Sequence, residues 1–548
     1  LESYIFLEQF KEAEKLTKHH IKKNPERIEL NIDYGFILEK WGKQSKAIQA
    51  YDNTLRSMVP NVNSILSVGN KFYQKGKYDY AIKAYKRGVK LVNGNYPFAF
   101  ELAKVYETKG NLTAVSKSLI GIMEYGDDYL ESVKGALSSY FYDDSNGKKR
   151  NVFKDILLEQ IQKHPSKDGY TELLIWFFLQ EKKFSSALIQ AIAIDKRNQE
   201  MGNRIIEIAD IFVQNKAYDV ALKAYKYLLE NKEDSYFYRM ARTKTVEILN
   251  KKIDEDPAAS QDDITALKKN YESALEELGR NNYTMDLIRG YALLLAFKYN
   301  DTEKAKEELN NALKQPRARN IELAKCKITL ADIYVKENNI WEAALLYGQV
   351  NHTFKEDIIG HEAKLKAAKT YFYGGDFKWA KAQLDILKAS TTKLIANDAL
   401  QLSVLISDNL GLDTSTAALK LYAKADLYNY QNNDSLAYLY YDSILELFPE
   451  NLTLLDDVYF MQAKINSKNK EWNSAINRYQ KAVEYDDLLK DDALFEMGLI
   501  YMDILKEPEK ALSCFEEIIL NHQDSFYAFE ARKRFRALRG DFNDQIVK

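Results

Sequence analysis

The chain has 548 residues and a formal net charge of −2, with 46% hydrophobic and 29% charged residues. Glycine (22) and proline (8) are scarce against a usual combined share of about 12%, which favours long, closely spaced helices over an all-β or α/β chain. The balanced charge gives no broad electrostatic case for nucleic acid or for an anionic membrane, and the hydrophobic fraction excludes global disorder.

One pattern recurs along the chain: a small residue, an aromatic residue three positions later, an alanine twelve later and an aromatic residue sixteen later. Gly69, Phe72, Ala81 and Tyr85 show it in full. In chain order, the alanine position is taken by Ala13, Ala47, Ala81, Val115, Phe153, Ala187, Ala221, Ala305, Ala343, Ala380, Ala437, Ala475 and Ala511. The last copy, from Gly498 to Ala511, carries one extra residue.

This order resembles the tetratricopeptide repeat (TPR), whose period is about 34 residues. The resemblance implies an all-α solenoid, a right-handed superhelix of antiparallel helix pairs with about 12–13 repeats. Small residues let the paired helices approach closely, and the aromatic residues fill the gap to the next pair. We expect about 25 helices, more than about 70% helix and no β-sheet.

The period breaks at three places, two of them in the first half of the chain. Leu1 lies only twelve residues before Ala13, so we expect the first helix to be incomplete at its start. Residues 251–263 predict a polar loop inside a degenerate repeat, with Asp262 or Asp263 as the N-cap of the helix that follows.

The third break predicts an additional helix. Residues 394–409 are apolar with helical period and end before Gly411, and a lone helix at this place is interpreted as a joint. The expected domains are an N-terminal sub-solenoid (1–250), the polar loop (251–263), middle repeats (264–390), the inserted helix (391–412) and C-terminal repeats with a capping helix (413–548).

No motif for a cofactor or a metal is present. Cys326 and Cys514 form no metal or disulfide pattern and are expected in the core. The glycines of 374–378 lack the residues of a phosphate loop, and the pair His361–Glu362 lacks the second histidine of a zinc helix. The most apolar stretch, 173–179, is too short to cross a bilayer. We therefore expect no cofactor, metal, small-molecule substrate or nucleic acid.

Two further patterns are interpreted structurally. The acid pairs Asp456–Asp457 and Asp491–Asp492 lie near expected helix starts, where acids cap free N–H groups, so a catalytic dyad is disfavoured. TPR domains that clamp the carboxylate of chaperone tails carry an Asn just after the small residue of successive repeats, and only Asn70 agrees here. Asn70 and Tyr73 stay candidate partner contacts.

The C-terminal region carries a narrower resemblance. Residues 509–519, Asp524–Ser525 and Ala531–Arg532 resemble the last repeats of BamD/YbgF-type bacterial envelope TPR proteins, and the region also resembles large Bacteroidota TPR (lipo)proteins. This resemblance implies a periplasmic, outer-membrane-associated location, with a lipid anchor upstream of Leu1. A cytoplasmic location is the alternative.

The expected function is a non-enzymatic protein–protein interaction scaffold, a subunit of an outer-membrane protein assembly or secretion complex that binds other envelope subunits. The alternative is a soluble periplasmic chaperone or adaptor that binds extended client segments. An enzyme is disfavoured, because the repeats leave no segment for a catalytic domain. Leu394 and Asp398, at the expected joint, are candidate partner contacts.

The last expected helix is basic. It carries Arg532, Lys533, Arg534, Arg536 and Arg539, while Phe526, Phe529, Phe535 and Leu538 are expected to pack it on the last repeat. Two interpretations stay open: a solvated cap, or a face formed by Arg532, Arg534 and Arg536 that contacts an acidic partner protein or lipid headgroups.

Overall fold

The computed structural model describes the chain except residues 232–235, 257–258, 389–391, 411–414, 486–488 and 541–548. The described ranges contain thirty α-helices and no strand, and 80% of the residues are helical. The all-α fold of antiparallel helix pairs is confirmed. The expected number of about 25 helices was too low, because single helices and one degenerate pair escape a count based on the repeat.

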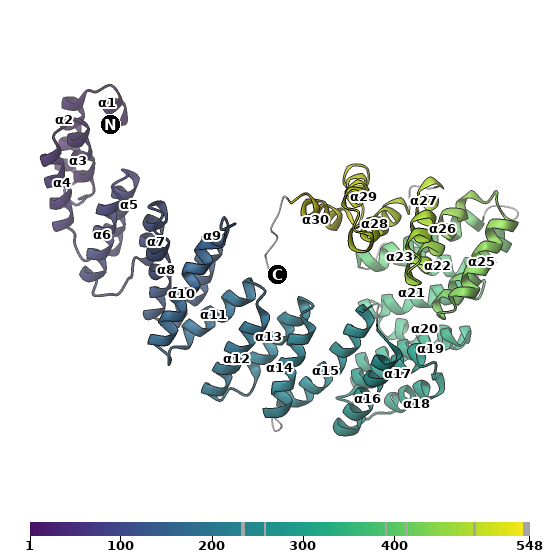
Figure 1. The fold of residues 1–548 in the computed structure, drawn as a ribbon. Helices are drawn as coiled ribbons and strands as arrows, with labels where there is room; N and C mark the ends of the chain where they lie inside the picture. The colour runs from purple at the N-terminus through teal and green to yellow at the C-terminus, as the bar shows by residue number, and fades with distance from the viewer. Residues whose placement is uncertain (232–235, 257–258, 389–391, 411–414, 486–488, 541–548) are drawn as a thin grey trace. The chain divides into compact units, whose positions relative to one another are not determined.

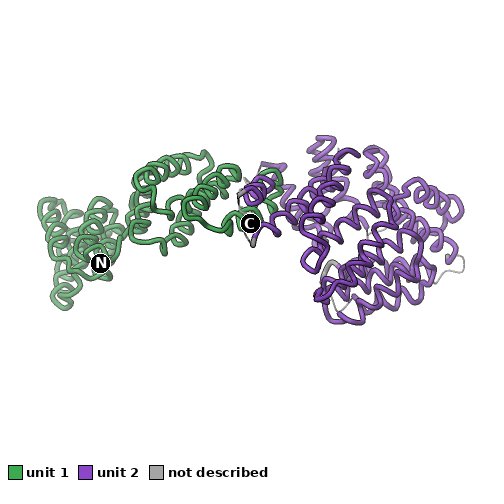
Figure 2. Tube along the Cα trace, turned by 90° about the horizontal axis from the view of Figure 1, so that it is seen from below, with its two compact units in different colours: residues 1–220, 545–548 green, residues 221–544 purple. Residues whose placement is uncertain are grey.

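The first compact unit comprises Leu1–Val220 (green in Figure 2). Its helices are α1 (Glu2–Phe6), α2 (Phe10–Lys23), α3 (Leu30–Lys40), α4 (Gln44–Arg56), α5 (Val62–Gln74), α6 (Tyr78–Leu91), α7 (Ala99–Thr108), α8 (Leu112–Gly121), α9 (Leu130–Phe141), α10 (Lys148–Lys163), α11 (Asp168–Gln180), α12 (Phe184–Asn198) and α13 (Asn203–Gln214), shown in Figure 1. Two 3-10 helices, η1 (Ile122–Glu124) and η2 (Asp127–Tyr129), follow α8.

The second unit begins at Ala221, inside α14 (Tyr218–Asn231). It continues with α15 (Tyr236–Glu255), α16 (Gln261–Leu278), α17 (Met285–Lys298), α18 (Thr302–Leu313), α19 (Asn320–Lys336), α20 (Ile340–Thr353), α21 (Ile358–Tyr373), α22 (Phe377–Leu387), α23 (Lys393–Leu410), α24 (Ser415–Tyr430), α25 (Asp434–Leu447), α26 (Leu452–Lys468), α27 (Trp472–Tyr485), α28 (Lys490–Leu499), η3 (Ile500–Leu505), α29 (Pro508–Asn521) and α30 (Ala528–Arg539). The domain limits expected from the sequence stay predictions.

The repeat pattern maps onto the core. Each residue at the alanine position of the repeat, thirteen in all, is at most 1% exposed. The small residue of the first helix receives the ring of the second: a Cβ at Gly69 would lie 2.2 Å from the ring of Tyr85, and one at Gly35 would lie 2.4 Å from Tyr51. At Gly35 and Gly69 glycine is therefore required, because the ring occupies the space that a side chain would need.

The extra residue of the last repeat is absorbed inside a helix rather than in the turn. α28 continues into η3, a π-helical turn. A π turn accommodates one additional residue without breaking the helix, so Gly498 still meets its ring: a Cβ there would lie 2.6 Å from Phe515.

The described residues of the polar segment 251–263 are mostly helical, which corrects the expected loop. α15 runs to Glu255 and α16 begins at Gln261. The N-cap is Ser260, not Asp262 or Asp263: its side chain accepts the backbone N–H of Asp263, whose carboxylate accepts the N–H of Ser260 in return. This capping box was missed because its serine lies one turn before the acids that drew attention.

The additional helix, α23, is confirmed, and it is packed rather than isolated. Ala399, Leu405 and Ile406 belong to the core cluster that also holds residues of α22, α24 and α26. The side chain of Asn451, at the start of α26, donates to Asn409 Oδ1 at 3.1 Å. The idea that α23 acts as a joint stays a prediction.

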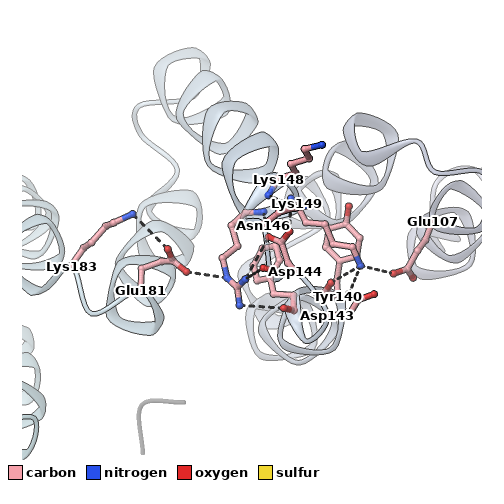
Figure 3. A network of polar contacts seen from close by, with 11 residues as sticks. Glu107, Tyr140, Asp143, Asp144, Asn146, Lys148, Lys149, Glu181 and Lys183 are labelled. Carbon is pink, nitrogen blue, oxygen red and sulfur yellow. Dashed lines mark hydrogen bonds and ion pairs between the residues drawn. The ribbon is translucent and has the colours of Figure 1, made fainter. Parts of the chain in front are cut away.

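A polar network connects the repeat that has Phe153 at the alanine position to the repeats before and after it (Figure 3). The carboxylate of Asp144 accepts the backbone N–H groups of Lys149 (3.1 Å) and Arg150 (2.9 Å) at the start of α10. The Arg150 guanidinium pairs with Glu181 at the end of α11 at 3.0 Å, and Lys149 Nζ reaches Glu107 on α7 at 3.3 Å. Charged contacts thus link three successive repeats. In the middle one, Phe141 stands where the repeat pattern has a small residue.

Ala437 tests the assigned register. It lies on α25, is 0% exposed and belongs to the core cluster, so Ala437→Trp should lower the free energy of unfolding by at least about 1–3 kcal/mol. The same change at Leu439, which is 58% exposed on the same helix, should leave stability nearly unchanged. Equal melting temperatures for wild type and Ala437→Trp, followed by circular dichroism, would show the register to be wrong.

Candidate functional site

Three neighbouring first helices of the second unit, α17, α19 and α21, are labelled in Figure 1. Their side chains line a groove of about 760 Å³. On α19 the lining residues Ile321, Lys325, Ile328 and Asp332 follow one another at helical spacing and therefore share one face. α21 contributes Ile358, Ile359, Glu362 and Lys366, and α17 contributes Arg289 and Leu293. We call this site the inner groove.

The inner groove has an aliphatic floor. Five of its lining residues are aliphatic, namely Leu293, Ile321, Ile328, Ile358 and Ile359. Ile328 is buried, whereas Ile358, the first residue of α21, is 63% exposed. An exposed isoleucine at the edge of a groove is apolar surface that a bound segment could remove from water.

Most charged residues of the inner groove are paired within the chain. Lys366 Nζ lies 2.8 Å from Asp332 and 3.8 Å from Glu362. The guanidinium of Arg289 lies 3.2 Å from Asp286. The groove consequently offers little net charge to a ligand, and its selectivity must come from the aliphatic floor.

Asp332 connects four helices of the second unit. Its carboxylate accepts hydrogen bonds from Lys366 on α21 and from the Tyr347 hydroxyl on α20. Its backbone carbonyl accepts the hydroxyl of Tyr430, on α24, at 3.3 Å. Burial and the nearby carboxylate raise the pKa of Tyr347 well above its ordinary value, so the phenol stays a donor.

Alternating charges continue along the first helices. The position just after the small residue is Asp332, Lys369, Asp426 and Lys464 in successive pairs. Burial raises the pKa of Asp426, and the charges of Lys369 and Lys464 act against that rise. In the first unit the same position holds Asn70, whose Oδ1 accepts the Tyr85 hydroxyl at 2.9 Å. These residues therefore serve contacts between helices of this chain.

A second cavity, of about 530 Å³, lies between α23, α26, α28 and the turn before α30. Its acidic lining residues are Asp398, Asp491, Asp492 and Asp524, and Lys464 is its lysine. Burial, followed by repulsion from Asp491, raises the pKa of Asp492 to about 6, while a hydrogen bond with Tyr527 opposes the rise.

The structure separates the candidate contacts named from the sequence. Asn70 and Tyr73 lie on α5 in the first unit, and the Tyr73 hydroxyl shares a hydrogen bond with Thr108 Oγ1 at 3.0 Å. Asp398 lines the acidic cavity, while the side chain of Leu394 lies outside the described part of the chain. Whether these residues bind a partner stays a prediction.

The basic residues of α30 divide into two groups. Arg534 pairs with Glu530 at 3.1 Å and with Asp503 at 3.6 Å, so it does not join the outward face expected of it. Arg532 and Arg536 are exposed. The inner groove was not predicted from the sequence, although the i, i+4 spacing of Ile321 and Lys325 could have indicated a shared face.

The acids and cysteines have structural surroundings. Asp456 and Asp457 lie in the second turn of α26, after its N-cap Asn451, so they do not cap that helix as expected. Asp491 and Asp492 do lie in the first turn of α28. Both cysteines are buried, and burial raises the thiol pKa to about 12 at Cys326 and about 11 at Cys514.

The described ranges hold no group of three or more His, Cys, Asp and Glu side chains suited to a metal ion. None of their helices has the length and apolarity needed to cross a membrane.

Known proteins share the repeat. A tetratricopeptide repeat model matches residues 492–525. The chain is similar to a TPR repeat-containing protein of Methanocaldococcus jannaschii, with 22% identity over 473 residues that cover 81% of this chain and 73% of that protein.

Two solved structures are similar in their helical repeats. One is a tetratricopeptide repeat protein from Parabacteroides merdae, with 16% identity, a TM-score of 0.29, and coverage of 53% of this chain and 98% of that one. The other is yeast Tom70, with 14% identity, a TM-score of 0.29, and coverage of 89% and 99%. With TM-scores this low, no property of either protein follows for this chain.

Asp492 gives a pH-dependent prediction. Its folded pKa of about 6 lies above the unfolded value of about 3.9, so this group removes stability as pH rises from about 4 through 6. Asp492→Asn should therefore raise the free energy of unfolding at pH 7.5 by about 1 kcal/mol, since partial exposure screens the charge. The gain should vanish at pH 4. A gain of equal size at both pH values, or an equal gain for Asp524→Asn, would contradict this assignment.

Proposed function

Because the chain is a tetratricopeptide repeat protein, we propose that it is an interaction scaffold whose inner groove holds a segment of a partner protein. TPR domains in general mediate protein–protein interactions and are not catalytic. The observation that carries the proposal is the set of aliphatic residues in the inner groove, with Ile358 63% exposed among charges most of which are paired.

The groove favours a short apolar segment. Its volume of about 760 Å³ is large enough for several side chains, within the range of about 300–1,000 Å³ that is usual for ligand sites. The paired charges of Lys366 and Asp332 would lose hydration under a bound charged group without gaining a new partner. An extended or helical segment with two or three aliphatic side chains fits this surface best.

The proposal includes a compartment and a type of assembly. We assign the protein to the periplasm as a subunit of an outer-membrane assembly or secretion complex. The support is the resemblance of residues 509–519 and of the segments that follow to envelope TPR proteins. The alternative function is a chaperone that binds extended client segments in the same groove.

Purification from the native cell in mild detergent, with mass spectrometry of the co-eluting proteins, tests this assignment. A scaffold co-purifies with membrane components at fixed stoichiometry. Many clients at low and variable occupancy would instead favour the chaperone, and exclusively cytoplasmic companions would contradict the envelope assignment.

Ile358 tests the groove itself. Ile358→Asp places a charge on the apolar edge of the inner groove and should lower recovery of the principal partner by about tenfold, as expected when an apolar anchor residue is lost. The residue is exposed, so stability should change by less than about 0.5 kcal/mol. Leu439→Asp, a similarly exposed site on α25, is the matched control. Equal recovery with both variants would contradict the use of this groove.

A further inference from the structure

The outer face of α30 combines exposed aromatic and basic side chains, and we propose that this face docks the second unit onto an anionic lipid surface. This inference concerns a surface away from the inner groove. It does not depend on the compartment assigned above, because anionic lipid surfaces occur on both sides of a cell membrane.

Helical spacing separates the two faces of α30. The inward face carries Ala528 and Ala531, which are buried, with Phe535 and Leu538 packed against the core of the last repeat. The outward face carries Phe529, Arg532, Lys533 and Arg536 at positions i, i+3, i+4 and i+7. We call these four residues the outer strip.

Arg532 and Lys533 supply the positive charge of the outer strip. The ion pairs of α30 are made by Arg534, which binds the carboxylates of Asp503 and Glu530. Across the described part of the chain, no acidic side chain lies within ion-pair distance of Arg532 or Lys533. This positive charge is therefore available to an anionic surface.

Aromatic rings stand beside the charges. Phe529 is 71% exposed, and Phe526, in the turn before the helix, is 67% exposed. Both rings were expected to pack on the last repeat, and that expectation was wrong: Phe535 and Leu538 pack against its core, whereas Phe526 and Phe529 are exposed. Rings next to cations are suited to the boundary between lipid headgroups and acyl chains.

The size of the strip favours lipid over a folded acidic protein. α30 has 12 residues, so it is about 18 Å long, and one face covers roughly 200 Å². A stable protein interface buries about 800 Å² on each partner, whereas a lipid surface needs no matching shape. Because Phe526 borders the acidic cavity, we expect the contact to begin at Phe529 and to continue toward Arg536.

Vesicle sedimentation of the full chain tests the proposal. The protein should sediment with vesicles in which roughly a third of the lipid is phosphatidylglycerol and the rest phosphatidylcholine, should not sediment with pure phosphatidylcholine, and should be released by about 0.5 M salt. Arg532→Gln/Lys533→Gln should weaken binding about 25-fold, since each basic residue near such a surface contributes roughly fivefold. Phe529→Ser should weaken it as well.

The matched control is Lys22→Gln/Lys23→Gln, which removes two adjacent exposed charges from α2 and should bind like wild type. Ile358→Asp should also bind like wild type, so failure of this proposal and failure of the groove are distinguishable. No binding to the anionic vesicles, or equal weakening by both double variants, would overturn the proposal. Binding to poly-glutamate but not to vesicles would assign the strip to an acidic protein instead.

Discussion

The contact between a small residue of one helix and an aromatic ring of its partner is the constraint on which the repeat depends. At Gly35 and Gly69 the ring of the second helix occupies the position that a side chain would need. A ring held this closely fixes the separation and the axial register of the two helices at once, because protein interiors are close-packed. The alanine position is then buried in every copy, and pair stacks on pair.

The same packing determines which side chains are available to bind a partner. Since each pair turns its small and aromatic residues inward, the free positions of the first helices line the inner groove. Many of the charges on the first helices are used within the chain. Asp332, in the inner groove, accepts hydrogen bonds from residues of α20, α21 and α24. Asp426, outside the groove, interacts with the charges of Lys369 and Lys464. What remains for a partner in the inner groove is apolar surface, while unshared positive charge occurs at Arg532 and Lys533.

The sequence predicted those features that depend on local spacing. The alanine positions, the buried cysteines and α23 follow from periodicity, and the structure confirms them. Features that depend on contacts between different helices were not predicted, because residue spacing within a helix carries no information about contacts between repeats. The bond from Tyr430 to Asp332, the pairing of Arg534 with Asp503 and the outward Phe529 belong to this class. The extra residue before Ala511 was seen, but its place in a π turn was not.

A double-mutant cycle at Gly69 and Tyr85, followed by urea unfolding, tests the central constraint most directly. If the ring requires the glycine, Gly69→Ala should cost at least about 2 kcal/mol in the presence of Tyr85. In the Tyr85→Ala background the same change should be neutral or should stabilise by up to about 1 kcal/mol, because alanine favours a helix over glycine. An effect of the same sign and size in both backgrounds would contradict the account.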